Sequence, residues 1–354
     1  MLRKEGLMKI HFDNIIYSLQ RAGGISTYWT ALITRLLRDQ VDISFTEMPN
    51  QNISRAEFII PPDKILKTDA GNILVNRFKS LSLPQQAKPF IFHSSYNRIT
   101  TNLHAKQVIT IHDFVHEKFY RGLRRYLHLY QKNKAIGGAE KIIAVSQNTK
   151  QDLLQFHPYL KEENIAVVYN GVSEDFFSLN NKKKENARPY LIFIGSRAYY
   201  KNFNFAIDLV AELSAFDLYI VGAGLSKSEG QLLQKKLKGR WKIFTHIEND
   251  ALNSIYNHAY ALIYPSSYEG FGIPLLEVMK TGTPFVALNK SSIPEVAGKA
   301  GLLVNELDID AFKQAILSID GKENELSTVG KEQAAKFSWE RCYKETLGVY
   351  KDLE

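Results

Sequence analysis

The sequence has little cysteine and no long apolar run. Cys342 is its single cysteine among 354 residues, which excludes an internal disulfide and a cysteine-based metal site and fits a reducing cytoplasm. No run of about 18 apolar residues occurs, so the sequence predicts no membrane-spanning helix. Residues 1–9 lack the apolar core of a signal peptide. Met8 is a second candidate start, because a strand-like segment begins at Lys9.

The composition is that of an ordinary globular protein with an uneven charge. Hydrophobic residues make up 45% and charged residues 23%, and the length suits two domains. The net charge of +8 lies in the first half: residues 1–173 hold 23 Lys and Arg against 14 Asp and Glu. Residues 174–354 hold 22 against 23. The sequence carries no recognisable nucleic-acid-binding motif, so this charge does not predict a nucleic-acid partner.

Residues 121–134 concentrate the positive charge. Leu123, Tyr126, Leu127 and Tyr130 recur there at helical spacing, while Arg121, Arg124, Arg125 and Lys132 lie largely elsewhere on the helix. A basic amphipathic helix of this kind can lie on an anionic membrane surface. An ordinary core-facing helix with a charged outer face fits the pattern equally well.

Apolar β-type segments alternate with helical segments throughout, which predicts parallel sheets with helices on both faces. The polar segment 173–188 reads as a linker. The predicted class is therefore α/β with two doubly wound domains, 1–173 and 185–337, and a last helix at 338–354. Strands are expected at 9–13, 41–46, 90–93, 108–111, 141–145, 165–168, 190–195, 217–221, 241–244, 260–264, 283–287 and 301–304. Helices are expected at 25–38, 120–136, 147–156, 202–214, 226–237, 250–259, 274–280, 309–318 and 339–353.

The segment 265–277, PSSYEGFGIPLLE, carries the strongest chemical signal. It follows a buried strand, Gly272 breaks the backbone, and Pro274 suits the first turn of a helix that stops at Gly282. Free N–H groups at such a helix start attract a diphosphate, and the carboxylates Glu269 and Glu277 can accept hydrogen bonds from hydroxyl groups. A phosphate beside several hydroxyls describes a nucleotide sugar. Each glutamate alone has a structural alternative. Glu277 could do no more than complement the helix dipole, and Glu269 could be a solvated loop carboxylate.

Other polar residues are expected where strands end, and ligands bind at that edge of a parallel sheet. Arg197 and Lys201 follow the first strand of the second half and could neutralise a diphosphate in place of a metal ion. Gly23 and Gly24 precede a helix and would allow a close backbone approach. The alternatives are exposed loop cations and a simple loop.

His112 and Asp113 end a strand of the first half. His112 could contact a sugar hydroxyl or the reaction centre, with Asp113 orienting it or capping the next segment; both could also be structural. The segment 221–224, VGAG, resembles part of a dinucleotide fingerprint but lacks the third glycine. It is therefore weak support for an NAD-dependent enzyme.

Taken together, these residues resemble the retaining glycosyltransferase family 4. The likeness rests on the Glu269–Glu277 pair around Gly-Phe-Gly-Ile-Pro, on the cationic, histidine and glycine positions above, and on segments 169–172 (YNGV) and 291–296 (SSIPEV). It covers nearly the whole chain in order. It implies the GT-B fold, in which two Rossmann-like domains face each other across a cleft and a C-terminal helix crosses back to the first. Lys201 follows Arg197 more closely than in many members.

The resemblance also implies roles for the candidate residues. Glu277 would contact the ribose, and Glu269 with the backbone at Phe271 and Gly272 would contact the sugar. Arg197 and Lys201 would hold the diphosphate, Gly24 would approach it across the cleft, and His112 would lie near the transferred sugar. The expected catalytic set is thus Glu269, His112, Arg197 and Lys201. The expected substrate-binding set is Gly23, Gly24, Asp113, Gly270, Phe271, Gly272, Ile273 and Glu277.

The predicted function is a metal-independent, cofactor-free, retaining hexosyltransferase that is cytoplasmic and peripheral to the inner face of the plasma membrane. GDP-mannose is the preferred donor by resemblance, with UDP-sugars next. The expected acceptor is a lipid-linked oligosaccharide, as in assembly of O-antigen, capsule or another surface polysaccharide. The alternatives are an inactive nucleotide-sugar-binding or scaffold protein of the same fold and the NAD-dependent enzyme. The linkage and the oligomeric state stay open.

Overall fold

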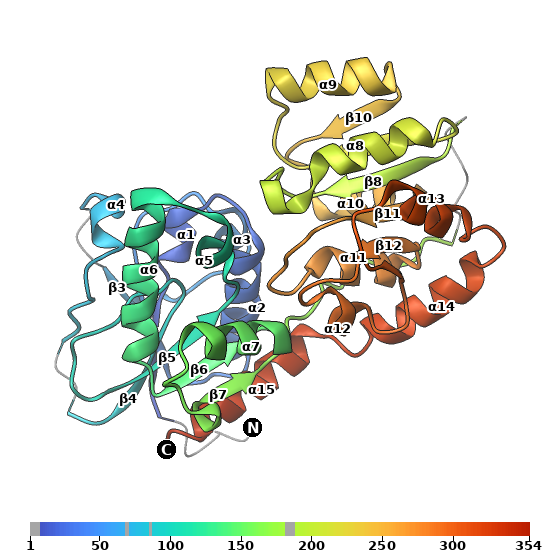
Figure 1. Ribbon diagram of the computed structural model, residues 1–354. Coiled ribbons are helices and arrows are strands. Elements are labelled where there is room, and N and C mark those ends of the chain that lie inside the picture. The colour runs from blue at the N-terminus through green and yellow to red at the C-terminus, as the bar shows by residue number, and fades with distance from the viewer. Residues whose placement is uncertain (1–7, 68–70, 85–86, 181–187) are drawn as a thin grey trace. The chain divides into compact units, whose positions relative to one another are not determined.

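The computed structural model describes residues 8–67, 71–84, 87–180 and 188–354 (Figure 1). The choice between Met1 and Met8 as the start, and the middle of the expected linker, concern segments outside this described part. The chain divides into two compact units. The first comprises residues 1–171 and 339–354, and the second comprises residues 172–338.

The first unit is built on a seven-stranded sheet of order β3-β2-β1-β4-β5-β6-β7, in which every pair is parallel. Buried apolar residues dominate its strands, as in sheets that helices cover on both faces. Its strands are β1 (Ile10–Asp13), β2 (Ile43–Glu47), β3 (Ile65–Lys67), β4 (Phe90–Ser94), β5 (Ala105–Ile111), β6 (Lys141–Ala144) and β7 (Ile165–Val167).

The helices of the first unit include three long ones, α2, α6 and α15. The α-helices are α1 (Ile16–Leu19), α2 (Gly24–Arg38), α3 (Ile53–Ala56), α4 (Ile73–Asn76), α5 (Val115–Phe119), α6 (Gly122–Gly137), α7 (Gln147–Phe156) and α15 (Trp339–Lys351). Short 3₁₀ turns are η1 (Pro62–Lys64) and η2 (Glu162–Asn164).

The second unit repeats the doubly wound plan with a six-stranded parallel sheet of order β10-β9-β8-β11-β12-β13. This order reverses between β8 and β11, which is where such sheets bind ligands. Its strands are β8 (Tyr190–Ile194), β9 (Asp217–Val221), β10 (Trp241–Phe244), β11 (Ala261–Tyr264), β12 (Phe285–Leu288) and β13 (Leu302–Val304). Its helices are η3 (Tyr199–Lys201), α8 (Phe203–Glu212), α9 (Lys227–Leu237), α10 (Asn249–His258), α11 (Ile273–Thr281), α12 (Ile293–Ala297), α13 (Ile309–Leu317) and α14 (Glu323–Ala334).

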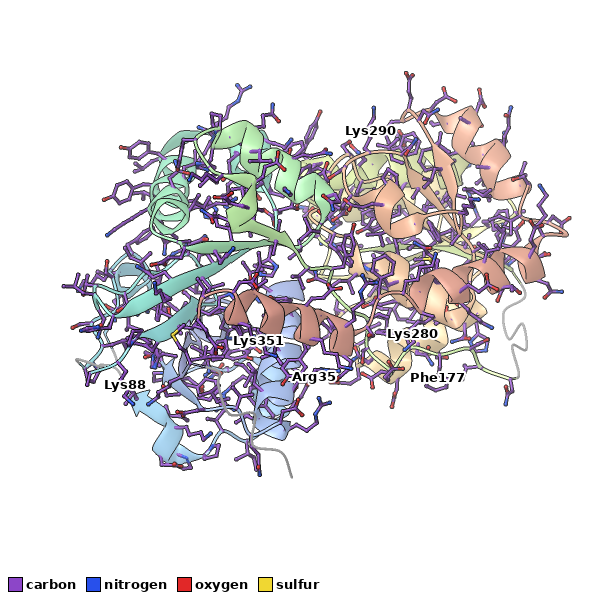
Figure 2. The ribbon with its side chains drawn as sticks, turned by 90° about the horizontal axis from the view of Figure 1, so that it is seen from below. Arg35, Lys88, Phe177, Lys280, Lys290 and Lys351 are labelled. Atoms are coloured by element: carbon purple, nitrogen blue, oxygen red, sulfur yellow. The ribbon has the colours of Figure 1, made fainter. Side chains whose placement is uncertain are left out.

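The last helix, α15, belongs to the first unit although 167 residues of the second unit precede it in the chain. Figure 2 shows Arg35 of α2 beside it, with Arg35 Nε 3.4 Å from a carboxylate oxygen of Glu340. The hydroxyl of Tyr350 lies 2.6 Å from Nδ1 of the buried His93 in β4. The C-terminal segment is therefore part of the core of the first unit.

Helix α6 differs from one of the two interpretations of residues 121–134, the core-facing helix with a charged outer face. The apolar residues that share one face are exposed, so the interpretation as a core-facing stripe is wrong. They form what we call the α6 stripe: Leu123, Tyr126, Leu127 and Tyr130. Lys132, expected on a charged outer face, is instead 3% exposed and pairs with Glu117 of α5 at 2.9 Å.

Candidate functional site

The segment after β11 adopts the predicted strand, turn and helix. Strand β11 is fully buried, and α11 begins directly after Gly272, whose φ of 104° favours glycine. Pro274 occupies the first turn, where no N–H is needed. Gly282 ends the helix in the left-handed conformation, and a Cβ there would lie 2.2 Å from Ser327 Oγ. Local sequence signals thus place Glu269 in the loop and Glu277 on the helix.

The loop that carries Glu269 is held from the segment that follows β12. The Ser292 hydroxyl lies 2.9 Å from the carbonyl oxygens of both Glu269 and Phe271. The Ser291 hydroxyl lies 2.6 Å from the Glu269 carbonyl and 3.2 Å from the Glu269 N–H. These bonds fix the backbone on both sides of Gly270, which is the part expected to meet the sugar.

A second anchor comes from the end of η3. Asn202 adopts a left-handed conformation, and its side-chain amide donates to the Pro265 carbonyl at 2.8 Å and to Ser267 Oγ at 2.7 Å. The N–H of Ser267 donates to the Tyr200 carbonyl at 2.8 Å. The loops after β8 and β11 are therefore tied together at the carboxyl edge of the sheet, where the strand order reverses.

Lys201 and Glu269 form an ion pair at this edge. Lys201 Nζ lies 2.5 Å from Glu269 Oε1, and the two side chains are 13% and 11% exposed. The hydroxyl of Tyr264, at the end of β11, also donates to Glu269. Burial raises the pKa of Tyr264 well above its usual value, and the negative charges of Glu269 and Glu277 raise it further. The Tyr264 hydroxyl therefore lies within electrostatic range of both carboxylates.

Glu277 is partly exposed as a residue, but its carboxyl group is enclosed by protein. Burial raises its pKa from 4.5 to about 7. The Tyr256 hydroxyl donates to Glu277 Oε2 at 2.9 Å and opposes that rise. Because a carboxylate has acceptor sites on both oxygens, hydroxyl groups of a ligand can still bind Glu277.

Arg197 is engaged elsewhere in the same unit. Its Nε lies 2.7 Å from Glu229 Oε1, its Nη1 donates to the Ala223 carbonyl at 2.8 Å, and its Nη2 donates to the Gly224 carbonyl. Glu229 is itself fixed, since it accepts from the Ser226 N–H at 2.7 Å in a capping box that starts α9. The pKa of Glu229 is lowered, chiefly by its hydrogen bonds with Ser226 and Arg197, which outweigh its partial burial.

The glycine segment 221–224 has a structural explanation. A Cβ at Gly222 would lie 2.6 Å from the carbonyl oxygen of Gly195, so the loops after β8 and β9 pack backbone to backbone. This contact, and the carbonyls that hold Arg197, account for the sequence without a dinucleotide.

The candidate residues of the first unit also lie at the carboxyl edge of their sheet. Gly23 and Gly24 begin α2, whose first turn has no side-chain cap. A Cβ at Gly23 would lie 2.7 Å from Gln20 Oε1. His112 follows β5 and packs edge to face on Tyr28 at a ring distance of 5.1 Å. Burial lowers the pKa of His112 to about 4, so the ring is neutral near pH 7.

Asp113 has a structural role in the free protein. Its Oδ1 accepts from the Val115 N–H at 3.0 Å, which starts α5, and its carbonyl accepts from Lys132 Nζ at 2.6 Å. The N-cap residue of α5 is Phe114, which has no side-chain capping bond, so the Asp113 carboxylate holds the turn that leads into the helix. The role of Asp113 towards His112 or a ligand stays a prediction.

Comparison with known proteins adds the family. The family model described as "Glycosyltransferase Family 4" matches residues 22–176, and the model described as "Glycosyl transferases group 1" matches residues 188–319. Together these matches span most of the chain. The chain belongs to the family 4 glycosyltransferases.

Relatives of this glycosyltransferase agree in sequence and in fold. The O-antigen chain mannosyltransferase B of Escherichia coli is 26% identical over 313 residues, which cover 79% of this chain and 81% of the relative. The structure of sucrose-phosphate synthase from Thermosynechococcus elongatus superposes with a TM-score of 0.75 at 16% identity and covers 98% of this chain and 99% of that one. Anabaena HepE in complex with UDP and glucose gives a TM-score of 0.73 at 15% identity, over 96% and 98%. The fold of the glycosyltransferase is GT-B.

Some residues of this glycosyltransferase site were not among the predicted ones. Tyr256 and Tyr264 each donate to one of the two glutamates, and Glu229 holds Arg197. Ser291 and Ser292 lie in the segment SSIPEV, so the sequence signal for them was present.

Within the described ranges, no three His, Cys, Asp or Glu side chains gather closely enough to hold a metal ion. Metal independence stays a prediction.

Proposed function

We propose that this glycosyltransferase moves a hexose, with retention and without a metal ion, from a nucleotide-diphosphate sugar to a glycan acceptor. The observation that carries the proposal is the Lys201–Glu269 pair beside Glu277 at the carboxyl edge where the sheet order reverses. A cation and two carboxylates there suit a ligand that carries both phosphates and hydroxyl groups.

In this proposal the donor replaces contacts that the free protein makes internally. Lys201 would turn from Glu269 to the diphosphate, which frees Glu269 to accept from hydroxyl groups of the sugar. Glu277 would accept from the ribose hydroxyls. Arg197 would reach the diphosphate by exchanging the Glu229 carboxylate for phosphate, both of which fit its planar fork.

The loop backbone completes the proposed donor site. The N–H groups of Gly270, Phe271, Gly272 and Ile273 lie at or just before the start of α11, where the helix dipole favours negative charge. Of the candidate residues in the first unit, Gly24 would approach the diphosphate and His112 would lie near the transferred sugar. Gly23 and Asp113 would be further substrate-binding residues. The neutral ring of His112 suits a hydrogen bond with a hydroxyl group.

The chemistry we propose needs no protein nucleophile. The bond between the sugar's anomeric carbon and the diphosphate breaks, and the acceptor oxygen bonds to that carbon on the same face. The acceptor's proton passes to the departing diphosphate. Lys201 and Arg197 would stabilise the charge that develops on this leaving group.

GDP-mannose is our preferred donor, and a UDP-sugar is the next candidate. The mannosyltransferase relative from Escherichia coli supports mannose, whereas the Anabaena structure contains UDP and glucose. The same mannosyltransferase acts on an O-antigen chain by its name, which supports an acceptor of that kind: a lipid-linked glycan of a bacterial surface polysaccharide.

The α6 stripe supports contact with an anionic membrane. Leu123 and Tyr126 are 73% and 66% exposed, and the same helix exposes Lys134 and follows the exposed Arg121. Apolar side chains flanked by cations suit a surface of acidic lipids, and we propose peripheral attachment at the inner face of the plasma membrane. No described helix is both long and apolar enough to cross a bilayer.

Sedimentation with anionic vesicles tests this attachment. We expect Leu123→Ser combined with Tyr126→Ser to reduce the bound fraction several-fold. Leu103→Ser is the matched control, because Leu103 is 98% exposed elsewhere in the same unit. The proposal would be contradicted if the wild type, the double variant and the control bound anionic vesicles equally. It would also be contradicted if the wild type bound neutral vesicles as well as anionic ones.

Transfer itself is tested in two steps. First, a panel of GDP- and UDP-sugars is screened for a rise in melting temperature, because a ligand that binds the native state stabilises it. Then transfer is measured with the stabilising donor and a lipid-linked acceptor. We expect Glu269→Ala and Arg197→Ala to abolish transfer while the fold persists, and the exposed-site control Glu325→Gln to retain it. Wild-type turnover by either folded variant refutes its role, and donor binding without transfer or hydrolysis favours the inactive scaffold.

A further inference from the structure

A cavity in the first unit has no role in donor binding as proposed above. It has a volume of about 280 Å³, close to the lower limit for small-ligand sites and enough for roughly one sugar ring. Its lining comes from the segments that follow β1, β3, β4 and β5 and from α6. The cavity therefore lies at the carboxyl edge of a parallel sheet, where ligands of doubly wound domains bind.

The cavity is lined by one guanidinium and by aromatic rings. Arg77 is held between the rings of Phe78 and Tyr96, at 5.0 and 5.1 Å from their centroids, and its Nη2 donates to the Tyr96 hydroxyl at 3.2 Å. Across the described part of the chain, this guanidinium has no carboxylate partner. By contrast, Arg55 of the same unit also lies over a phenylalanine but pairs with Glu47 at 2.9 Å.

Two histidines continue the polar wall. The rings of His116 and His128 stack with a centroid distance of 3.7 Å, and His128 Nδ1 lies 3.3 Å from the Tyr96 hydroxyl. The side-chain nitrogen of Gln20, which also lines the cavity, is buried and has no hydrogen-bond partner among the residues that the structure describes. No Asp or Glu is among the described residues that line the cavity. The cavity thus offers donors and positive charge without an internal acid.

The cavity also touches the α6 stripe and the glycine loop. Leu127 lines the cavity and is itself 40% exposed as a member of the stripe. Gln20 is the side chain that a Cβ at Gly23 would strike. A ligand bound here would have apolar surface on one side and the start of α2 on the other.

We infer that this cavity binds an anionic group of the acceptor, with Arg77 as the residue that recognises the charge. A guanidinium that pairs with none of the described carboxylates and lies beside stacked rings suits a phosphate or carboxylate carried by a sugar. The inference rests on the proposed function, because it names the acceptor class of that reaction. The anion has two possible sources, the phosphate that joins the glycan to its lipid and an acidic sugar of the glycan.

Imidazole NMR signals of His116 and His128 provide a local readout that donor-site binding does not mimic. The full-length protein is labelled on histidine, and the two signals are identified from His116→Asn and His128→Asn. The probes are inorganic phosphate, farnesyl phosphate, glucuronate and methyl glucoside. We expect the anionic probes to shift both signals and the neutral glycoside to leave them unchanged at the same concentration.

The variants separate recognition of charge from general damage. Arg77→Gln is expected to weaken anion binding at least about tenfold, whereas Arg77→Lys, which keeps the charge, weakens it less. Lys79→Gln is the matched control, because it removes the same charge from an exposed residue two positions away. Equal shifts by the neutral glycoside, or unchanged anion affinity in folded Arg77→Gln, would overturn the inference.

The probes also identify the source of the anion. Tighter binding of farnesyl phosphate than of inorganic phosphate assigns the site to a lipid-linked phosphate, and tighter binding of glucuronate assigns it to an acidic sugar. Thermal stabilisation by nucleotide sugars is measured on the same proteins. If the wild type binds none, the proposed function fails independently of the cavity result. If Arg77→Gln binds the donor normally but transfers poorly, the defect lies with the acceptor.

Discussion

Donor binding should depend on pH through Glu277. Burial raises the pKa of this carboxyl to about 7, and the ionised form is the stronger acceptor for ribose hydroxyls, because both of its oxygens accept and neither carries a proton. At pH 6 only about a tenth of such a group is ionised, and at pH 8 about nine-tenths. The apparent affinity for the donor is proportional to the fraction of protein whose Glu277 is ionised. The donor should therefore bind roughly tenfold more weakly at pH 6 than at pH 8. Both phosphates of the donor are esterified and keep their charge throughout this range.

Stability of the free protein should change in the opposite direction. The folded pKa is raised, so the contribution of Glu277 is fully present below the unfolded value of 4.5 and is lost as pH rises through about 7. The whole difference corresponds to roughly 3 kcal/mol. Glu277→Gln should remove this dependence and make the free protein more stable at pH 8 by up to about that amount.

The assay is calorimetric titration of the stabilising nucleotide sugar between pH 6 and 8, with urea unfolding of the free protein at each pH. Tyr256→Phe removes a hydrogen bond that lowers the pKa of Glu277, so it should move the midpoint of donor binding to higher pH. Glu325→Gln is the control and should leave both curves unchanged. A donor affinity that is flat with pH in the wild type, or that keeps its slope in Glu277→Gln, refutes the reasoning.

Three further predictions concern stability and are checked by urea unfolding. Glu117→Gln should destabilise the protein by about 3–5 kcal/mol, because it leaves the buried ammonium of Lys132 without its anion; a loss below 1 kcal/mol argues against a charged pair. Gly272→Ala should cost about 1–2 kcal/mol because of its positive φ, whereas Gly230→Ala, inside α9 with open space around it, should stabilise by about 0.5–1 kcal/mol; equal effects contradict this. Tyr350→Phe should cost about 1–3 kcal/mol by unpairing a buried imidazole nitrogen of β4, and a neutral result would contradict the pairing.

The parts predicted correctly are those that local signals decide. The segment 265–277 turns from strand to helix because Gly272, Pro274 and Gly282 each favour one backbone conformation at one position. The α/β class followed from alternating apolar periods. Strand β3 (ILK) was not predicted, and α14 was not predicted because its sequence is mostly polar.

Helix α6 shows what periodicity leaves open. Helical spacing correctly groups Leu123, Tyr126 and Leu127 on one face, but it does not say which face meets the core. The buried face holds Lys132, which is tolerated because Glu117, on a different helix, neutralises it. The partner of Lys132 lies outside residues 121–134, so no pattern within that segment shows that Lys132 is buried.

The ion pairs of the two cations predicted to bind the diphosphate likewise could not be predicted from local sequence. The sequence identified Arg197 and Lys201 as groups that can bind phosphate, yet in the free protein each already holds a carboxylate. Glu229 could be predicted as the capping-box residue of α9, but its ion pair with Arg197 depends on how the loops after β8 and β9 pack. A diphosphate must compete with both carboxylates, so its net binding energy is a difference between two sets of ion pairs. Under the proposed function, the free site would therefore be close to neutral, and it would favour a ligand that offers phosphates to the cations and hydroxyl groups to Glu269.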